Sequence, residues 1–309
     1  MTDVSVVMPT WNRARFLPAA IESVFAQTVR VRELIIVDDG SDAPARAVLE
    51  KYAAMPGVRV LWRSHCGIPG ALRNAAIREA TGPYIAFADS DDVWCAEKLE
   101  RQLAALRARP ECRWSYTSVS FIDAQGLATP PPGDPTPRPH PGSLAERLAT
   151  LHVDVPLPSV LAERALLLEA GLFDESLGCY EDYDLWMRLA ALAEGAAVPE
   201  ALVKLRQHDE HFSRRDPRAA LGGRANFLAR ALRRVHTPAI CAELRRMRAL
   251  DLAQLASLAA RSGDAGDAAQ SLRSSLADGW SVPRWWLIAA RTHSQLWNLR
   301  ARRTWGQWW

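Results

Sequence analysis

Three carboxylates in D-x-D-D spacing are the residues of this chain most capable of chemistry. The apolar run at residues 84–88 predicts a buried strand, and Asp89-Ser90-Asp91-Asp92 follows it directly. Burying an unpaired carboxylate is costly, so acids at the end of a core strand usually face a cleft and a cation. Hard oxygen ligands at this spacing suit Mg²⁺ or Mn²⁺, which commonly hold substrate phosphates. The alternative is a solvated turn that caps a helix beginning near Val93.

Polar residues also follow two other predicted strands. The strand at 4–9 ends in Pro9-Thr10-Trp11-Asn12, and the strand at 33–37 ends in Asp38-Asp39-Gly40-Ser41. In a parallel sheet, ligands bind beyond the carboxyl ends of the strands. Chance placement in turns explains one such end, but three together predict a ligand crevice.

The elements that position these residues alternate between short apolar strands and longer helices. Strands are expected at 4–9, 33–37, 58–61 and 84–88, and helices at 15–27, 45–52, 70–80 and 96–108. This alternation predicts an α/β fold with a mostly parallel central sheet flanked by helices. Strands at 114–121 and 157–162 follow. They are separated by a proline-rich segment at 129–143 that is either a disordered excursion or, as we expect, a loop over the crevice.

An Ala/Leu/Arg-rich pattern replaces this alternation beyond about Arg218. It predicts two helices over residues 221–261, and hence a catalytic domain at 1–218 and a helical C-terminal extension at 219–309.

The bulk composition excludes several classes of protein. A net charge of +3 is too small to argue for nucleic acid as a partner, and the five scattered cysteines form no C-x-x-C pair. This cysteine usage argues against a disulfide framework or a zinc knuckle and fits a reducing compartment. No basic-then-apolar leader precedes the first strand, and no run of about eighteen apolar residues is long enough to span a bilayer. We therefore expect a cytoplasmic protein.

A series of short motifs runs in order along residues 4–213. They are Val6-Val7-Met8-Pro9-Thr10-Trp11-Asn12-Arg13, Ile36-Val37-Asp38-Asp39-Gly40-Ser41, Gly67-x-x-Gly70-Ala71-x-Arg73-Asn74, Asp89-Ser90-Asp91-Asp92-x-Trp94, Gly171-x-Phe173-Asp174-Glu175, Glu181-Asp182-x-Asp184-Leu185-Trp186-x-Arg188, and Arg206-Gln207-His208 followed by Ser213. Each motif is weak alone, but their order is specific. Through them the chain resembles the family 2 glycosyltransferases, inverting enzymes of the GT-A (nucleotide-diphospho-sugar transferase) fold.

The resemblance implies a donor pocket for a nucleoside diphosphate-sugar, with UDP preferred. Asp39 resembles the acid that accepts an N–H of uracil, although an Asx turn with Gly40 would also use it. Arg73 lies where the family has a cation near the diphosphate, and an exposed helix arginine is the alternative. His65 departs from the asparagine of many relatives. The implied nucleotide-sugar-binding residues are Pro9, Thr10, Asn12, Asp39, Gly67, Arg73, Asp89 and Glu181.

The resemblance also implies a divalent cation, Mg²⁺ or Mn²⁺, held against the diphosphate. Asp91 is the expected direct ligand, and Asp89 either ligates or bonds the ribose. His208 is a further ligand of the metal or of a phosphate, while Asp92 is expected to cap a helix. The cation would stabilise the negative charge that develops on the departing nucleoside diphosphate.

Asp182 resembles the family's catalytic base, which takes the proton of the acceptor hydroxyl. The neighbouring Glu181 could raise the pKa of Asp182 by like-charge repulsion. The alternative is that both residues, with Asp184, are first-turn acids favourable to a helix N-terminus.

The C-terminal stretch is rich in tryptophan and arginine and contains no acid from Ser281 onward. Trp prefers membrane interfaces and Arg is attracted to anionic lipid, so one hypothesis is peripheral contact with the inner face of a membrane. The alternatives are packing on the catalytic domain and a dimer surface. The residues are Trp280, Trp285, Trp286, Trp297, Trp305, Trp308 and Trp309, with Arg284, Arg291, Arg300, Arg302 and Arg303.

The prediction from sequence is therefore an inverting, metal-dependent glycosyltransferase that acts on a saccharide, lipid-linked or peptide acceptor. A sugar-1-phosphate nucleotidyltransferase would want a Gly-rich basic loop where Pro9-Thr10-Trp11-Asn12 stands. A haloacid-dehalogenase-like phosphatase would carry its D-x-D after the first strand. The remaining alternative is a catalytically silent module that binds a nucleotide-sugar.

Overall fold

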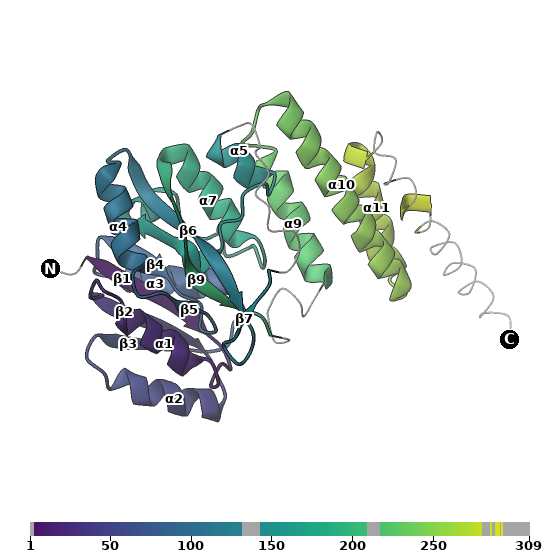
Figure 1. The fold of residues 1–309 in the computed structure, drawn as a ribbon. Helices are drawn as coiled ribbons and strands as arrows, with labels where there is room; N and C mark the ends of the chain where they lie inside the picture. Colours follow the sequence, from purple (N-terminus) through teal and green to yellow (C-terminus); the bar gives the residue numbers. More distant parts are fainter. Residues whose placement is uncertain are drawn as a thin grey trace. The chain divides into compact units, whose positions relative to one another are not determined.

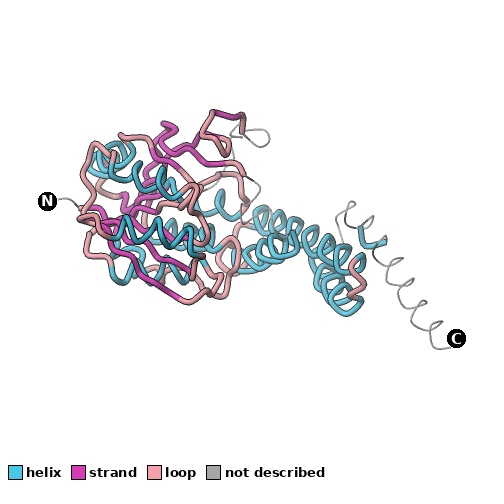
Figure 2. The backbone as a smooth tube through the Cα atoms, turned by 90° about the horizontal axis from the view of Figure 1, so that it is seen from below, coloured by secondary structure: helices cyan, strands magenta, loops and turns pink. Residues whose placement is uncertain are grey.

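The computed structural model describes residues 3–131, 143–208 and 217–279, with residues 285, 288–290 and 292. The chain divides into two compact units, one of Met1–Ser176 and Glu181–Asp209 and the other of Leu177–Tyr180 and Glu210–Trp309. Helices and strands alternate in the first unit, and the described part of the second is helical (Figures 1 and 2). The sequence-based prediction put the boundary at 218.

The predicted strand–helix alternation is confirmed in the first part of the first unit. Its elements are β1 (Val4–Thr10), α1 (Leu17–Phe25), β2 (Glu33–Asp39), α2 (Ala43–Ala53), β3 (Val58–Arg63), α3 (Pro69–Glu79), β4 (Tyr84–Phe87), β5 (Val93–Trp94) and α4 (Lys98–Ala108). The remaining elements are β6 (Cys112–Ile122), β7 (Ala128–Thr129), α5 (Leu144–Ala149), the short helix η1 (Leu157–Ser159), β8 (Val160–Glu163), α6 (Arg164–Glu169), α7 (Glu181–Leu192) and β9 (Glu194–Arg206).

Local sequence explains where these elements begin. Proline stands in the first turn of α1, α2 and α3, where its fixed φ suits a helix start and its missing N–H costs nothing. The Asp42 side chain caps α2 by accepting the N–H of Ala45 at 3.0 Å. β1 and β2 are buried at every position, as expected for central parallel strands covered on both faces.

Among the described residues, a sheet of nine strands runs in the order β3-β2-β1-β4-β8-β6-β9-β5, with β7 paired to β6. The pairs β3-β2, β2-β1 and β1-β4 are parallel, as the alternation predicted. Beyond β4 the sheet is mixed, because β8 runs antiparallel to both β4 and β6 while β9 runs parallel to β6. The carboxyl ends of β1 and β2 therefore lie beside the turn that follows β4.

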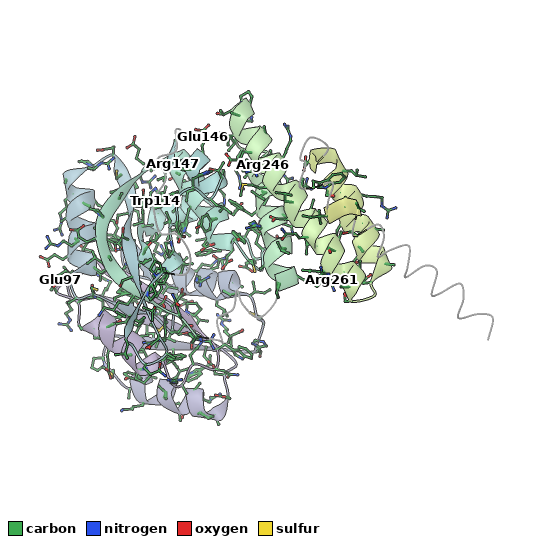
Figure 3. The ribbon with its side chains drawn as sticks, turned by 45° about the vertical axis from the view of Figure 1, so that its right-hand side comes forward. Glu97, Trp114, Glu146, Arg147, Arg246 and Arg261 are labelled. Carbon is green, nitrogen blue, oxygen red and sulfur yellow. The ribbon has the colours of Figure 1, made fainter. Side chains whose placement is uncertain are left out.

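Helices cover both faces of this sheet. α1, α2 and α4 pack on one face, where Val6 and Leu34 join Leu17, Leu49 and Leu99 in one buried cluster. The other face carries α3 and, beyond it, an aromatic cluster centred on fully buried Trp186 of α7. Trp186 stacks on Trp114 of β6, which is labelled in Figure 3, and meets Phe87 and Phe173 edge to face. This cluster fixes the N-terminal turn of α7 against the sheet.

The second unit contains α9 (Pro217–Ala231), α10 (Pro238–Arg261) and α11 (Ala265–Gly279). The two predicted helices over 221–261 are thus confirmed as α9 and α10. Trp285 is fully buried among Ala249, Ala253 and Ala289, and its indole N–H donates to Ser275 Oγ at 3.0 Å. Trp285 therefore packs within this unit. The other tryptophans and the arginines named for the tail lie outside the described residues.

Candidate functional site

Asp39, at the end of β2, holds the turn that follows β3. It is almost fully buried, and its carboxylate accepts the N–H of Cys66 at 2.8 Å and that of Gly67 at 2.9 Å. His65 Nδ1 lies 2.8 Å from the same carboxylate. A carboxylate has about four acceptor positions, so Asp39 retains capacity for a further N–H. Gly40 is required beside it, because its φ is +69° and a Cβ there would lie 2.8 Å from the His65 nitrogen.

The residues after β1 line the same corner. The rings of Trp11 and His65 stack with centroids 4.7 Å apart. Thr10, the last residue of β1, is buried beside Pro9, and its hydroxyl has no hydrogen-bond partner among the described residues. Asn12 instead joins two turns: its N–H donates to Ser41 Oγ at 3.0 Å and its Oδ1 accepts the N–H of Asp42 at 2.7 Å.

Arg73, on α3, links two acids that are far apart in the sequence. It is buried, and its guanidinium donates to Asp89 Oδ1 at 3.1 Å and to Glu181 Oε1 at 2.9 Å. Burial alone would lower the pKa of Arg73, but the two carboxylates outweigh it and raise that pKa. A buried cation held in this way connects the turn after β4 to the first turn of α7.

Asp91 and His208, which the resemblance implied as cation ligands, lie in contact with each other. Asp91 Oδ2 lies 3.0 Å from His208 Nε2 and 3.3 Å from Arg13 Nε. His208 follows β9 and is buried, while Asp91 follows β4. The resemblance implied a ligand role for each of these two residues, but neither their mutual contact nor that of Arg13 with Asp91 was predicted.

The prediction that Asp92 caps a helix is wrong. Val93 and Trp94 form the short strand β5 instead of a helix start, and α4 begins only at Lys98. Asp92 is buried, and its Oδ1 accepts the main-chain N–H of Arg206 at 2.8 Å. Burial and the nearby charges of Asp91 and Asp89 raise the pKa of Asp92 well above its ordinary value. The acid therefore anchors the D-x-D-D turn to the end of β9.

Glu181 and Asp182 open α7. Glu181 is buried beside Arg73, whereas Asp182 remains partly exposed. Burial and the charge of Glu181 raise the pKa of Asp182 to about 7. Burial also raises the pKa of Glu181, against the lowering effect of Arg73. A carboxyl with solvent access and a pKa near neutrality is suited to accepting a proton.

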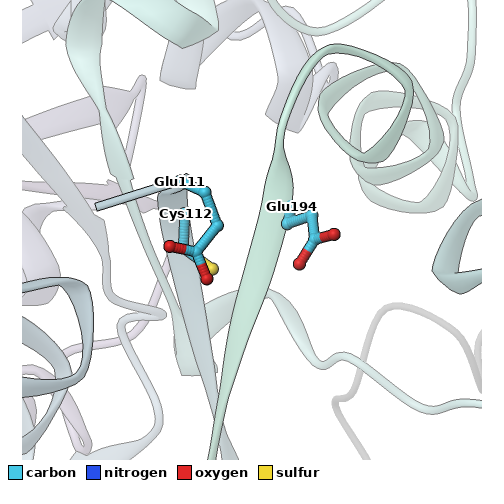
Figure 4. A group of neighbouring side chains, drawn as sticks. All are labelled: Glu111, Cys112 and Glu194. Carbon is cyan, nitrogen blue, oxygen red and sulfur yellow. The ribbon is translucent and has the colours of Figure 1, made fainter. Parts of the chain in front are cut away.

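Elsewhere in the described residues, one group of acids and a cysteine has its potential metal-binding atoms close together. It consists of Glu111, Cys112 and Glu194, at the starts of β6 and β9 (Figure 4). Arg109 pairs with Glu111 at 3.2 Å and with Glu194 at 3.0 Å, so both carboxylates already have a cationic partner. This group contains none of the predicted metal ligands.

Two functional candidates were missed from the sequence, although both stand in the motifs quoted for the resemblance. Arg13 contacts Asp91, and Arg206 holds both Asp91 and Asp92. The available signal was position: Arg13 follows the first strand, and Arg206 lies two residues before His208.

No helix in the described part of the chain has the length and apolar character needed to cross a membrane.

The chain is similar to known glycosyltransferases in sequence and in fold. The model of the family named Glycosyl transferase family 2 matches residues 5–120. WfgD of Escherichia coli, named a UDP-Glc:alpha-D-GlcNAc-diphosphoundecaprenol beta-1,3-glucosyltransferase, is 35% identical over 103 residues, which are 33% of this chain and 40% of WfgD. The chain spans less than two thirds of the length of each of the first curated relatives that it matches, between 35% and 64%.

Two solved structures share the fold over nearly the whole chain. Staphylococcus aureus TarS 1–349 in complex with UDP-GlcNAc aligns with a TM-score of 0.65 and 18% identity, covering 99% of this chain and 92% of that one. The mannosyltransferase PcManGT of Pyrobaculum calidifontis, in complex with GDP-Man and Mn²⁺, aligns with a TM-score of 0.61 and 17% identity, covering 98% and 87%. The chain is thus similar to the family 2 glycosyltransferases over residues 5–120 and has the GT-A fold.

Proposed function

We propose that this chain transfers a sugar from a nucleoside diphosphate-sugar, with UDP as the nucleotide, to an acceptor hydroxyl with inversion at the anomeric carbon. The observation that carries the proposal is the buried Arg73 bridge, which joins Asp89 of the D-x-D-D turn to Glu181, the neighbour of Asp182. Through this bridge Asp89, proposed to lie beside the donor, and Glu181, the neighbour of the proposed base Asp182, belong to one ionic cluster. The UDP-GlcNAc complex of TarS and the UDP-Glc named for WfgD support UDP as the nucleotide.

In the proposed reaction, Asp182 accepts the proton of the acceptor hydroxyl. The acceptor oxygen forms a bond to the anomeric carbon from the face opposite the nucleoside diphosphate. The bond from that carbon to the diphosphate oxygen breaks, and its electron pair stays on the diphosphate. The partial exposure of Asp182 and its raised pKa support this assignment, because the group can meet an acceptor and release its proton near neutral pH.

The residues at the D-x-D-D turn have the chemistry to hold a divalent cation. Asp91 offers a hard oxygen 3.0 Å from the imidazole nitrogen of His208, and Asp89 stands two residues earlier in the same turn. Carboxylate oxygen with imidazole nitrogen is a donor set that a first-row divalent cation such as Mn²⁺ accepts. When bound, the cation would supply positive charge for the departing diphosphate. The Mn²⁺ in the PcManGT complex supports this proposal by analogy of fold.

The acceptor is proposed to be a saccharide, a lipid-linked saccharide or a peptide, and the lipid-linked acceptor named for WfgD favours the second. Contact of the Trp/Arg-rich tail with a membrane would bring the enzyme to such an acceptor.

Replacing Asp182 by Asn tests the function most directly. We expect donor binding to be kept and nucleoside diphosphate release from a panel of UDP-, GDP- and dTDP-sugars to fall about 10²- to 10⁴-fold, the usual contribution of a general base. Asp267→Asn, which changes an exposed carboxylate of α11, is the matched control and should turn over like the parent.

A parent protein that binds a donor sugar but releases no nucleoside diphosphate, with or without acceptors, would instead identify a silent binding module. Full activity in Asp182→Asn would refute Asp182 as the base while leaving transfer itself in place.

A further inference from the structure

Arg206 fastens the D-x-D-D turn at several points. It is the last residue of β9 and is buried. Its main-chain N–H donates to Asp92 Oδ1 at 2.8 Å, and its side-chain Nε donates to the main-chain oxygen of Asp91, also at 2.8 Å. A terminal nitrogen donates to the main-chain oxygen of Asp123 at 3.0 Å. One residue thereby ties the turn after β4 to the ends of β6 and β9.

The same guanidinium lies against an aromatic ring that also contacts His208. It stands 5.1 Å from the centroid of the Phe16 ring. The rings of Phe16 and His208 are 4.8 Å apart, and Phe16 is buried. Arg206 thus contacts the main chain of Asp91 on one side and the ring that supports His208 on the other.

A role in stability alone does not require this arrangement. A methionine could fill the buried space, and a lysine could supply the charge. The planar guanidinium is needed where separate donors must reach two carbonyl oxygens while the flat face rests on a ring. Because those contacts hold the main chain of Asp91, they limit the directions its carboxylate can take toward His208.

We propose that Arg206 is a positioning residue of the cation centre, holding Asp91 and His208 so that both meet one divalent cation. The inference rests on the proposed function, since it assumes that Asp91 and His208 bind that cation. Residues that orient metal ligands without touching the metal typically contribute 10- to 100-fold to metal affinity.

The test measures Mn²⁺ binding directly, by the loss of the free-ion electron paramagnetic resonance signal in the presence of UDP. We expect Arg206→Lys to weaken Mn²⁺ binding roughly 10- to 100-fold, the range for groups that orient metal ligands. Arg113→Lys is the control, because Arg113 pairs with Glu163 and Glu169 away from the D-x-D-D turn. Its Mn²⁺ affinity should match that of the parent.

Circular dichroism melting shows whether each variant is folded. If Arg206→Lys does not fold, Phe16→Leu takes its place, since it removes the ring between Arg206 and His208 and should also weaken Mn²⁺ binding. Mn²⁺ affinity within twofold of the parent in the folded variant would overturn the positioning role alone. A parent protein that binds UDP but no Mn²⁺ would overturn it together with the proposed metal dependence.

Discussion

Asp182 owes its raised pKa first to burial and second to Glu181, which makes the pH dependence of activity informative. As the proposed base, Asp182 must be deprotonated, so kcat should rise with pH through about 7 in the parent protein. The charge of Glu181 raises the pKa of Asp182, and the charge of Arg73 lowers it. Without the charge of Glu181, the effect of Arg73 is opposed less, so the pKa of Asp182 should fall.

Glu181→Gln should therefore shift the acidic limb of the kcat profile to lower pH, measured by nucleoside diphosphate release between pH 5 and pH 9. A limb that stays in place or moves to higher pH would contradict the coupling of these two acids. Glu175→Gln, at an exposed acid near the same helix, is the control.

Lys98 is a buried amine whose hydrogen-bond partner, Gln102 Oε1, is uncharged, and its nitrogen lies 4.2 Å from the Trp94 ring centroid. Burial lowers the pKa of Lys98 to about 7, against an ordinary value near 10.5. Between these values the unfolded chain binds the proton and the folded protein does not, so stability should rise with pH by up to about 1.4 kcal/mol per unit.

Lys98→Met should remove this contribution to the slope, measured by urea unfolding at pH 7, 8 and 9 with tryptophan fluorescence. Lys51→Met, at an exposed position of α2, should keep the parent slope. An unchanged slope in Lys98→Met would show that the amine stays protonated in the core.

At the scale of elements, the turn after β2 depends on Gly40. There the cost of a steric clash can be measured separately from the cost of the positive φ. Gly40 and Gly57 both have positive φ, +69° and +86°. A Cβ at Gly40 would also meet the His65 main chain at 2.8 Å, whereas a Cβ at Gly57 meets nothing within 4 Å. The second substitution should thus cost only the left-handed conformation, about 1–2 kcal/mol.

Gly40→Ala should cost more than Gly57→Ala and should also weaken UDP binding, because it displaces the turn that Asp39 holds. Isothermal titration with UDP and urea unfolding of both variants would check this. Equal losses of stability and unchanged UDP affinity in both variants would refute this prediction for Gly40.

Much of the first half of the sheet could be predicted because its signals are local. β1 and β2 are continuous apolar runs, and Pro18, Pro44 and Pro69 mark helix starts. The mixed half could not, since β5 is only a two-residue strand that forms by pairing with β9, more than a hundred residues away. The alternative of a helix beginning near Val93 fails for that reason, whereas the helix expected at 96–108 is present as α4.

The candidate site divides in the same way. Asp89, Asp91 and Asp182 could be named from their motifs, but their partners come from other elements. Nothing in the residues around Arg73 indicates that it bridges Asp89 and Glu181, and nothing around Asp92 indicates that it binds the main chain of Arg206. Such contacts depend on the sheet order and so appear only in the fold.

For the whole molecule, the burial of Trp285 changes how the membrane hypothesis must be tested. Truncating the chain near Val282 would remove a core residue of the second unit along with the tail, so lost binding would have no clear meaning. Point substitutions avoid this problem.

Replacing Trp297, Trp305, Trp308 and Trp309 by Ser should reduce co-sedimentation with anionic liposomes by roughly tenfold, because interfacial tryptophans contribute to such binding. Trp285→Phe should leave liposome binding unchanged and lower the melting temperature instead. Equal sedimentation of the parent and the four-fold variant would refute membrane contact through these residues.

The Arg73 bridge has a consequence for recombination between relatives. The family model matches residues 5–120, which carry Arg73 and Asp89, whereas Glu181 and Asp182 lie beyond it. A chimera joined between these segments inherits a buried cation from one parent and one of its two counter-ions from the other. Removing one partner of a buried ion pair destabilises a protein by several kcal/mol, so hybrids of parents with matched residues at 73, 89 and 181 should be more stable than mismatched hybrids. The segment with Arg73 and Asp89 and the segment with Glu181 are therefore expected to be exchanged together.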